Sequence, residues 1–114
     1  MKNEEELLSN LILELRRGTL ILSVLSQMKT PKYGYALVQS LEEKGVAAEA
    51  NTLYPLLRRL EKQGLLVSEW DTEEAKPRKY YHRTSQGDRI YLELRQHWKD
   101  MSANMEKLLG EDQL

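Results

Sequence analysis

Residues 51–83, NTLYPLLRRLEKQGLLVSEWDTEEAKPRKYYHR, combine a strong helical pattern with two short runs typical of β-strands. Four leucines recur at i, i+3, i+4 and i+7, so they share one helical face that should pack inward: Leu53, Leu56, Leu57 and Leu60. Gly64 is expected to end this helix, and residues 65–70 and 78–83 read as strands because they are rich in Val, Trp and Tyr. The polar turn at 71–77 joins them. This layout predicts a winged helix-turn-helix, mainly α with a small β-hairpin.

The helix face opposite the leucines carries groups that bind nucleic acids. It presents a hydroxyl, a tyrosine ring and three cations, opposed nearby only by Glu61: Thr52, Tyr54, Pro55, Arg58, Arg59 and Lys62. Side chains of these types bind phosphates and base edges. Taken alone, the three cations fit a solvated helix face about as well as a DNA contact. The basic wing that follows favours DNA.

Positive charge is concentrated in one segment, although the whole chain carries a formal net charge of −1. From Lys76 to Arg83 there are four cations and no anion, whereas residues 84–114 hold four cations against six anions. Such a local basic surface is expected where one face binds DNA and another face has a different task.

Length and composition indicate one globular domain without catalytic motifs. At 114 residues, with 40% hydrophobic and 31% charged residues, the chain has the balance of a soluble domain. It has no cysteine, and His82 and His97 are too few for a typical transition-metal site. The sequence contains no glycine-rich phosphate loop and no recognisable nucleophile motif, so neither enzyme activity nor a cofactor is expected. No apolar run approaches the roughly 18 to 20 residues of a membrane span, and the cytoplasm is the expected compartment.

Two further helices are expected before residue 51. Apolar residues from Leu7 to Met28 outline one long first helix, in which Gly18 would mark either a bend or a close approach to another backbone. Pro31 ends that helix, because proline disfavours helical geometry in the residue before it. A second helix should run over 33–44, followed by a connection or a minor strand at 46–50.

The third helix is expected to start at Asn51 or Thr52. With Thr52 as the N-cap, Pro55 would be the third helical residue, where a missing N–H has no intrahelical partner to lose. The proline then marks the start of the helix and does not break it.

A last helix should follow Thr84 or Ser85, either of which can act as its N-cap. Its apolar residues alternate steps of three and four, as in the seam of a coiled coil: Tyr91, Leu94, Trp98, Met101, Met105 and Leu108. Because so narrow a seam needs a helical partner, it should pack on the first helix, on a second subunit, or on both in a homodimer. The expected organisation is a winged-helix domain over residues 1–84 and a C-terminal dimerisation helix over residues 85–114.

Four blocks of the sequence resemble the PadR family of transcriptional regulators: RRGTLILSVLSQM, YGYALVQSLEEKG, NTLYPLLRRLEKQGLL and PRKYYHRTSQG. They follow one another in the order and at the intervals of that family, and the resemblance covers residues 11–87. The single C-terminal helix resembles the short subgroup, whose members form dimers through this helix and the first one. The resemblance implies a dimeric repressor on a two-fold operator in double-stranded DNA, with the first helix joining the seam at the dimer interface through Leu8, Leu11 and Leu15.

The resemblance also implies which residues would contact DNA. They would come from the start of the second helix, from the third helix and from the wing: Tyr33, Asn51, Thr52, Tyr54, Arg58, Lys62, Lys76, Arg78 and Lys79. Arg59 joins them from the cationic helix face described above. Glu73 and Glu74 in the wing turn are the residues least expected to help DNA binding.

Some short members of the family bind flat aromatic drugs in a pore at the dimer interface, between one tryptophan from each subunit. Trp98 occupies the position of that tryptophan, so a planar aromatic ligand would contact Trp98, Met101 and Leu94. Tryptophan and methionine give the flat, adaptable surface that such binding needs. The competing interpretation is that the same residues only fill the seam.

Two alternatives remain open in the sequence. Strand alternation places one of Tyr80 and Tyr81 inward and the other outward, without saying which. The functional alternative to a DNA-binding repressor is a winged-helix adaptor whose seam recruits a foreign protein helix, which the placement of charge disfavours.

Overall fold

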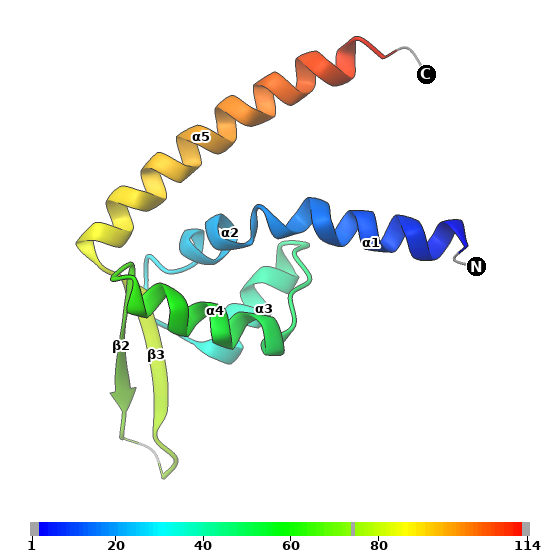
Figure 1. The fold of residues 1–114 in the computed structure, drawn as a ribbon. Helices are drawn as coiled ribbons and strands as arrows, with labels where there is room; N and C mark the ends of the chain where they lie inside the picture. The colour runs from blue at the N-terminus through cyan, green and yellow to red at the C-terminus, as the bar shows by residue number, and fades with distance from the viewer. Residues whose placement is uncertain (1–2, 74, 113–114) are drawn as a thin grey trace.

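The computed structural model describes residues 3–73 and 75–112. Its described part is mainly helical with one small sheet, so the predicted fold class is confirmed (Figure 1). Its elements in chain order are α1 Glu4–Arg17, α2 Leu20–Ser26, β1 Lys32–Tyr33, α3 Gly34–Glu43, α4 Ala50–Lys62, β2 Leu66–Asp71, β3 Arg78–Arg83 and α5 Ser85–Gly110. Glu74, one of the two wing residues least expected to help DNA binding, lies outside the described residues. So do residues 1–2 and 113–114, at the outer ends of the two predicted domains.

The three strands form one antiparallel sheet in the order β1-β3-β2. β2 and β3 are the predicted hairpin. β1 is a strand that the sequence pattern did not predict, and its two residues pair with Tyr80 and Tyr81 on the other edge of β3. The minor strand considered for 46–50 does not form, because 46–49 lack regular structure and α4 begins at Ala50. Pro31 disfavours helical backbone at Thr30, and the two residues after it become β1 by pairing with β3.

The hydrophobic core lies between α2, α3, α4 and the sheet. It includes all four leucines predicted to face inward from the third helix: Val24, Leu25, Met28, Leu37, Leu41, Leu53, Leu56, Leu57, Leu60, Leu66 and Tyr81. Tyr81 is 4% exposed and is therefore the inward-facing tyrosine of the pair. The opposite face of α4 is held outward, because turning it inward would expose four buried leucines.

The prediction of one long first helix is wrong, since the segment is broken into α1 and α2. Gly18 is the C-cap of α1, and Thr19 precedes α2. The N–H and the hydroxyl of Thr19 both donate to the carbonyl oxygen of Arg16 at 3.0 Å, which closes a turn tighter than an α-helical one. A Cβ on Gly18 would have no neighbouring atom within 4 Å, so of the two expectations for this glycine the structure has the bend, at the break between α1 and α2, and no close approach of another backbone segment of the described chain.

The third helix, α4, also starts earlier than predicted. It begins at Ala50 with Glu49 as N-cap, and the Glu49 side chain makes no capping hydrogen bond. Pro55 is therefore the sixth residue of the helix, counted from Ala50, and the carbonyl of Asn51 lacks its usual intrahelical donor. Asn51 and Pro55 both lie on the exposed face, where water can supply the missing hydrogen bond.

The last helix, α5, is fixed to the end of α4 through its N-cap. Thr84 is the cap, and its Oγ1 accepts from the Gly87 N–H at 2.9 Å and donates to the Gly64 carbonyl at 2.6 Å. Figure 1 shows α1 and α5 extending as two arms on the same side of the molecule. Both arms expose large apolar side chains: Leu7, Leu8, Leu11, Leu13, Leu15, Trp98, Met101, Met105 and Leu108.

Gly87 permits the close packing of α5 on the turn after α4, so Gly87→Ala should destabilise the fold. A Cβ there would lie 2.0 Å from the carbonyl oxygen of Leu65. Alanine gains about 1 kcal/mol over glycine in a helix, but overpacking typically costs about 1 to 3 kcal/mol, and the upper part of that range applies because the overlapping atom belongs to the backbone. Thermal unfolding followed by circular dichroism should show a melting temperature lower by several degrees.

Gly110→Ala is the matched control, because a Cβ at this other glycine of α5 would meet no atom within 4 Å. It should keep the melting temperature or raise it slightly at equal protein concentration, because it gains helix propensity without an overlap. Equal melting temperatures for both variants and the parent chain would contradict the packing described for Gly87.

Candidate nucleic-acid interface

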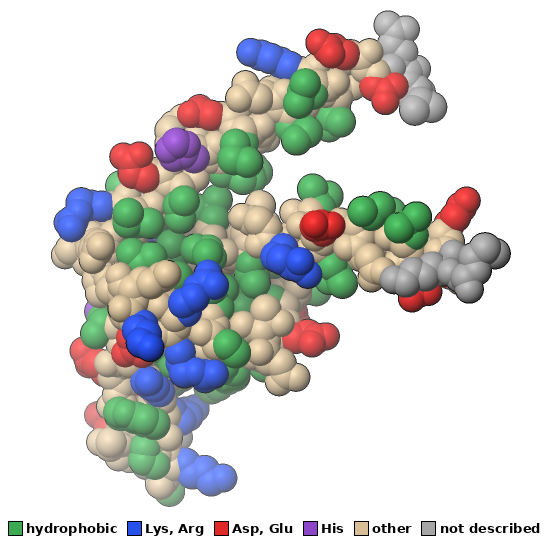
Figure 2. All heavy atoms as spheres, in the orientation of Figure 1, with side chains coloured by type: hydrophobic (Ala, Val, Ile, Leu, Met, Phe, Trp, Pro, Cys, Tyr) green, Lys and Arg blue, Asp and Glu red, His purple; other side chains and the backbone are tan. Residues whose placement is uncertain are grey.

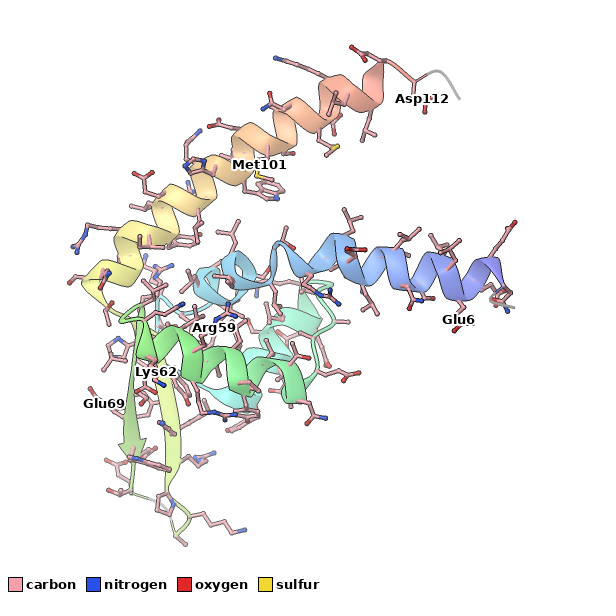
Figure 3. The ribbon with its side chains drawn as sticks, viewed as in Figure 1. Glu6, Arg59, Lys62, Glu69, Met101 and Asp112 are labelled. Carbon is pink, nitrogen blue, oxygen red and sulfur yellow. The ribbon has the colours of Figure 1, made fainter. Side chains whose placement is uncertain are left out.

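The exposed side of α4 is divided between two grooves. Tyr54 and Arg58 line a groove toward the hairpin, whereas Thr52 and Arg59 line a second groove toward α1 and α2. Figure 3 shows Arg59 on the side of α4 that faces α2, and Lys62 at its C-terminal end beside the strands. The remaining predicted residues of α4 are exposed: Asn51 and Lys62. The predicted cationic face is therefore two surfaces that point in different directions.

The groove between α4 and the hairpin, called here the wing groove, has a volume of about 370 Å³. Three cations and five aromatic rings line it, together with one glycine: Tyr33, Gly34, Tyr35, Tyr54, Arg58, Trp70, Arg78, Lys79 and Tyr81. None of these described lining residues is acidic. A groove with cations and aromatic rings and without anions suits an anionic partner.

The base of the wing is held by Arg78 and its neighbours, which we call the Arg78 cluster: Tyr33, Tyr35, Asp71 and Arg78. The rings of Tyr33 and Tyr35 stack with centroids 5.8 Å apart. The Arg78 guanidinium lies 4.4 Å from the Tyr33 ring centroid, and its Nη1 donates to the Tyr35 hydroxyl at 2.9 Å. The Tyr33 hydroxyl donates to the Asp71 carboxylate, which lowers the pKa of Asp71. Arg78, predicted to contact DNA from the wing, thus also orients the wing against α3.

The outer side of the hairpin carries a second tyrosine contact. Tyr80 packs edge to face on Tyr33, with ring centroids 6.0 Å apart. Its hydroxyl donates to the Glu69 carboxylate at 2.9 Å, and this hydrogen bond raises the pKa of Tyr80. Glu69 is labelled on β2 in Figure 3. These contacts continue the Arg78 cluster from β1 across the sheet.

Glu61 connects α4 directly to the hairpin. Lys79 Nζ lies 3.6 Å from Glu61 Oε1, and the Ser68 hydroxyl donates to the other carboxylate oxygen of Glu61. The sequence pattern presented Glu61 only as an anion opposing the cationic face. The sequence does contain a signal that Glu61 faces the hairpin. It follows Tyr54 by seven residues, which places both residues on the same side of the helix.

Lys76 lies in the exposed turn between β2 and β3, away from the Arg78 cluster. The Glu73 N–H in the same turn donates to Asp71 Oδ1 at 3.1 Å. The three predicted wing cations therefore occupy two levels, with Lys76 in the turn and Arg78 and Lys79 where the wing meets the helices.

The second groove lies between the α1–α2 junction and α4 and has a volume of about 330 Å³. Its lining combines apolar side chains with two arginines: Arg17, Leu20, Ile21, Thr52, Pro55, Leu56 and Arg59. The structure brings Arg59 together with Arg17, a residue that the sequence patterns did not single out, and separates it from Arg58.

Figure 2 shows how side-chain types are distributed over one face of the molecule. Lys and Arg side chains gather over the region of α4 and the wing, whereas hydrophobic and acidic side chains predominate on the two arms. This separation matches the prediction of one basic surface and one surface with a different task.

The predicted seam of α5 starts on the core and continues into solvent. Tyr91 and Leu94 pack against the core, and the Arg83 guanidinium lies 4.3 Å from the Tyr91 ring centroid. Further along, Trp98 is 46% exposed and Met101 is 66% exposed. In this single chain Trp98 and Met101 begin an open apolar strip that Met105 and Leu108 continue, whereas Leu94, the third predicted ligand residue, lies against the core.

Within residues 3–73 and 75–112, no helix is both long and apolar enough to span a membrane. The same part of the chain contains no group of three or more His, Cys, Asp or Glu side chains arranged to hold a metal ion.

Comparisons with known proteins agree with this architecture. The model of the PadR-like family of transcriptional regulators matches residues 21–93. A curated relative, transcriptional regulator Rv3488 of Mycobacterium tuberculosis, is 34% identical over 73 residues, which cover 64% of this chain and 68% of the relative.

Solved structures show the same similarity over more of the chain. A PadR family regulator from Eggerthella lenta has a TM-score of 0.89 and 53% identity, covering 95% of this chain and 96% of its own. A PadR-like regulator from Bacillus cereus has a TM-score of 0.76 and 29% identity, covering 84% of this chain and 96% of its own. These relatives are regulators and not enzymes. The chain belongs to the PadR-like family of transcriptional regulators.

Proposed function

We propose that the protein is a homodimeric repressor that binds double-stranded DNA through α4 and the wing. The observation that carries this proposal is the wing groove, where Arg58 of α4 and Lys79 of β3 line one open surface without an acidic lining residue. α4 enters the major groove, with Asn51, Tyr54 and Arg58 toward the base edges and Thr52 on its other side, while Lys62 and the wing contact the backbone. Tyr33 lies beside Gly34, at the start of α3, where it can reach a phosphate.

The proposed dimer is supported by the exposure of both arms. α1 has 14 residues, none of them buried. Isolated helices of about this length are marginal in water, so α1 needs a partner for its leucines. The exposed apolar strip of α5 on a second copy, from Trp98 to Leu108, supplies one. A two-fold dimer presents two α4 helices to half-sites about one helical turn, or roughly 10 base pairs, apart.

The proposed release of DNA depends on the same interface. A planar aromatic molecule between the Trp98 rings of the two subunits, in contact with Met101 and Leu94, would change how the α5 helices pack. Because each α5 is fixed to its winged helix through Thr84, this change alters the spacing of the two α4 helices. Such a ligand lowers DNA affinity if it binds the DNA-compatible spacing of the dimer less tightly than another spacing. The loss of DNA affinity is at most the ratio of the ligand's affinities for the two spacings.

The first prediction separates base reading from backbone contact. Arg58→Ala should weaken binding to a duplex from the DNA upstream of the protein's own gene by about 1 to 3 kcal/mol and reduce sequence discrimination. Lys76→Ala should weaken binding to all sequences alike and lower the salt slope by about one. Lys76 is a cleaner probe than Lys79, because removing Lys79 also breaks its contact with Glu61.

Fluorescence anisotropy at two salt concentrations measures both quantities. Lys107→Ala in the last turn of α5 is the control, because this cation lies outside the proposed DNA surface. Unchanged affinity and salt slope in both the Arg58 and the Lys76 variants would exclude α4 and the wing as the DNA surface.

The second prediction concerns the dimer. Leu8, Leu11 and Leu15 lie on one side of α1, whereas Leu13 lies on the other, and all four are more than half exposed. Leu11→Asp should produce monomers in sedimentation equilibrium, because an aspartate would be buried without a partner at the interface. Leu13→Asp is matched in residue type, helix and exposure and should remain dimeric. If Leu11→Asp is as dimeric as Leu13→Asp, α1 does not form the interface through this side.

The third prediction concerns the ligand. Uncharged planar aromatic compounds should quench tryptophan fluorescence of the parent protein and release it from DNA. Trp98→Ala should abolish both effects while Trp70 remains as the fluorophore. If Trp98→Ala keeps the full ligand response, the aromatic site does not lie at Trp98.

A further inference from the structure

Trp70 is a large apolar side chain that the core does not use. It lies on β2 and is 62% exposed, whereas Leu66 on the same strand is 2% exposed. Alternation along the strand directs Leu66, Ser68 and Trp70 to one face of the sheet. That face points toward α4, because Leu66 joins the core and Ser68 bonds to Glu61 of α4. Trp70 continues this row toward the wing turn and lines the wing groove.

The surroundings of Trp70 combine apolar surface with positive charge. Lys79 is its register partner on β3, and Lys79 Nζ lies 6.0 Å from the indole centroid. Tyr54 and Arg58 of α4 line the same groove. An aromatic wall with cations beside and across from it suits a partner that alternates apolar and anionic groups. The sugar–phosphate backbone of DNA is such a partner, because apolar deoxyribose faces alternate with phosphates.

We propose that Trp70 is a DNA-contact residue that packs its indole on the deoxyribose backbone of one strand lying in the wing groove. This inference rests on the proposed DNA-binding function and adds a contact that the basic residues alone do not provide. The indole face covers a sugar, and Lys79 binds a phosphate beside it, while Arg58 across the groove reaches the base edges. The contact fixes how deeply the duplex enters between α4 and the wing, and it is independent of base sequence because every nucleotide offers the same sugar.

The groove geometry favours the backbone over the bases as the partner of Trp70. Trp70 lies on the hairpin, while the residues proposed to read base edges lie on α4. The cation nearest to its ring belongs to the hairpin as well. With α4 in the major groove and the wing on the backbone, as proposed above, the indole meets sugars and phosphates first.

The test is a comparison of Trp70→Ala and Trp70→Phe with Val67→Ala. Val67 is the matched control, because it is an exposed apolar residue of β2 on the opposite face of the strand. Trp70→Ala should weaken binding to the upstream duplex by on the order of tenfold, while Trp70→Phe keeps part of the affinity because it retains a ring. Val67→Ala should bind like the parent protein.

Two further measurements make the result specific. Trp70→Ala should keep the parent melting temperature, because the side chain is largely exposed, and should weaken a random-sequence duplex by the same factor as the upstream duplex. Acrylamide quenching of the parent protein should fall on saturation with DNA, and this fall should be absent in Trp70→Phe, which contains only Trp98.

The outcomes separate this inference from the function on which it rests. If the parent protein binds DNA but Trp70→Ala binds equally well, or quenching does not change at saturation, the Trp70 contact is refuted and the DNA-binding function stands. If Trp70→Ala loses affinity only for the upstream duplex, Trp70 reads bases and the backbone assignment is refuted. If the parent protein shows no salt-dependent DNA binding, the proposed function itself fails.

Discussion

The contacts that hold the wing against the helices are the constraint on which the proposed DNA surface depends. Arg78 packs on the Tyr33 ring and bonds to Tyr35, and Glu61 holds Ser68 and Lys79 from α4. These contacts set the angle between α4 and the hairpin, and that angle forms the wing groove. A change in the angle would separate Arg58 from Lys79, so Arg58 could no longer reach the base edges while Lys79 binds the neighbouring backbone.

The strength of these contacts differs from that of the core. Each buried leucine of α4 contributes about 1.5 to 3 kcal/mol, so four of them fix the position of the helix firmly. A partly exposed ion pair such as Glu61–Lys79 contributes on the order of 1 kcal/mol or less, and a partly exposed cation–π contact such as Arg78–Tyr33 about 1 kcal/mol. The wing is therefore the adjustable part of the surface, and a DNA phosphate can replace Glu61 as the partner of Lys79 at little cost.

The leucine spacing of residues 53–60 and the β-rich runs around a polar turn were sufficient to predict α4 and the hairpin. The two-residue strand β1 was not predictable, because its stability comes from pairing with β3 and not from its own sequence. The break at Gly18 depends on a local turn that a periodic pattern does not reveal. The candidate site likewise was predictable only in part. Residue types predicted a basic surface. That Arg59 lines a groove with Arg17, and that Arg78 supports the wing, depends on contacts between segments distant in the sequence.

Hydroxyl-radical footprinting on the DNA upstream of the gene tests the central claim most directly, because it maps backbone contacts at single-nucleotide spacing. The account predicts protected patches related by two-fold symmetry, with their centres about one helical turn apart, because two α4 helices enter successive major grooves. Backbone protection by the wing should flank each patch. A single asymmetric patch would contradict the dimer, and no protection at protein concentrations that saturate binding would contradict the assignment of α4 and the wing as the DNA surface.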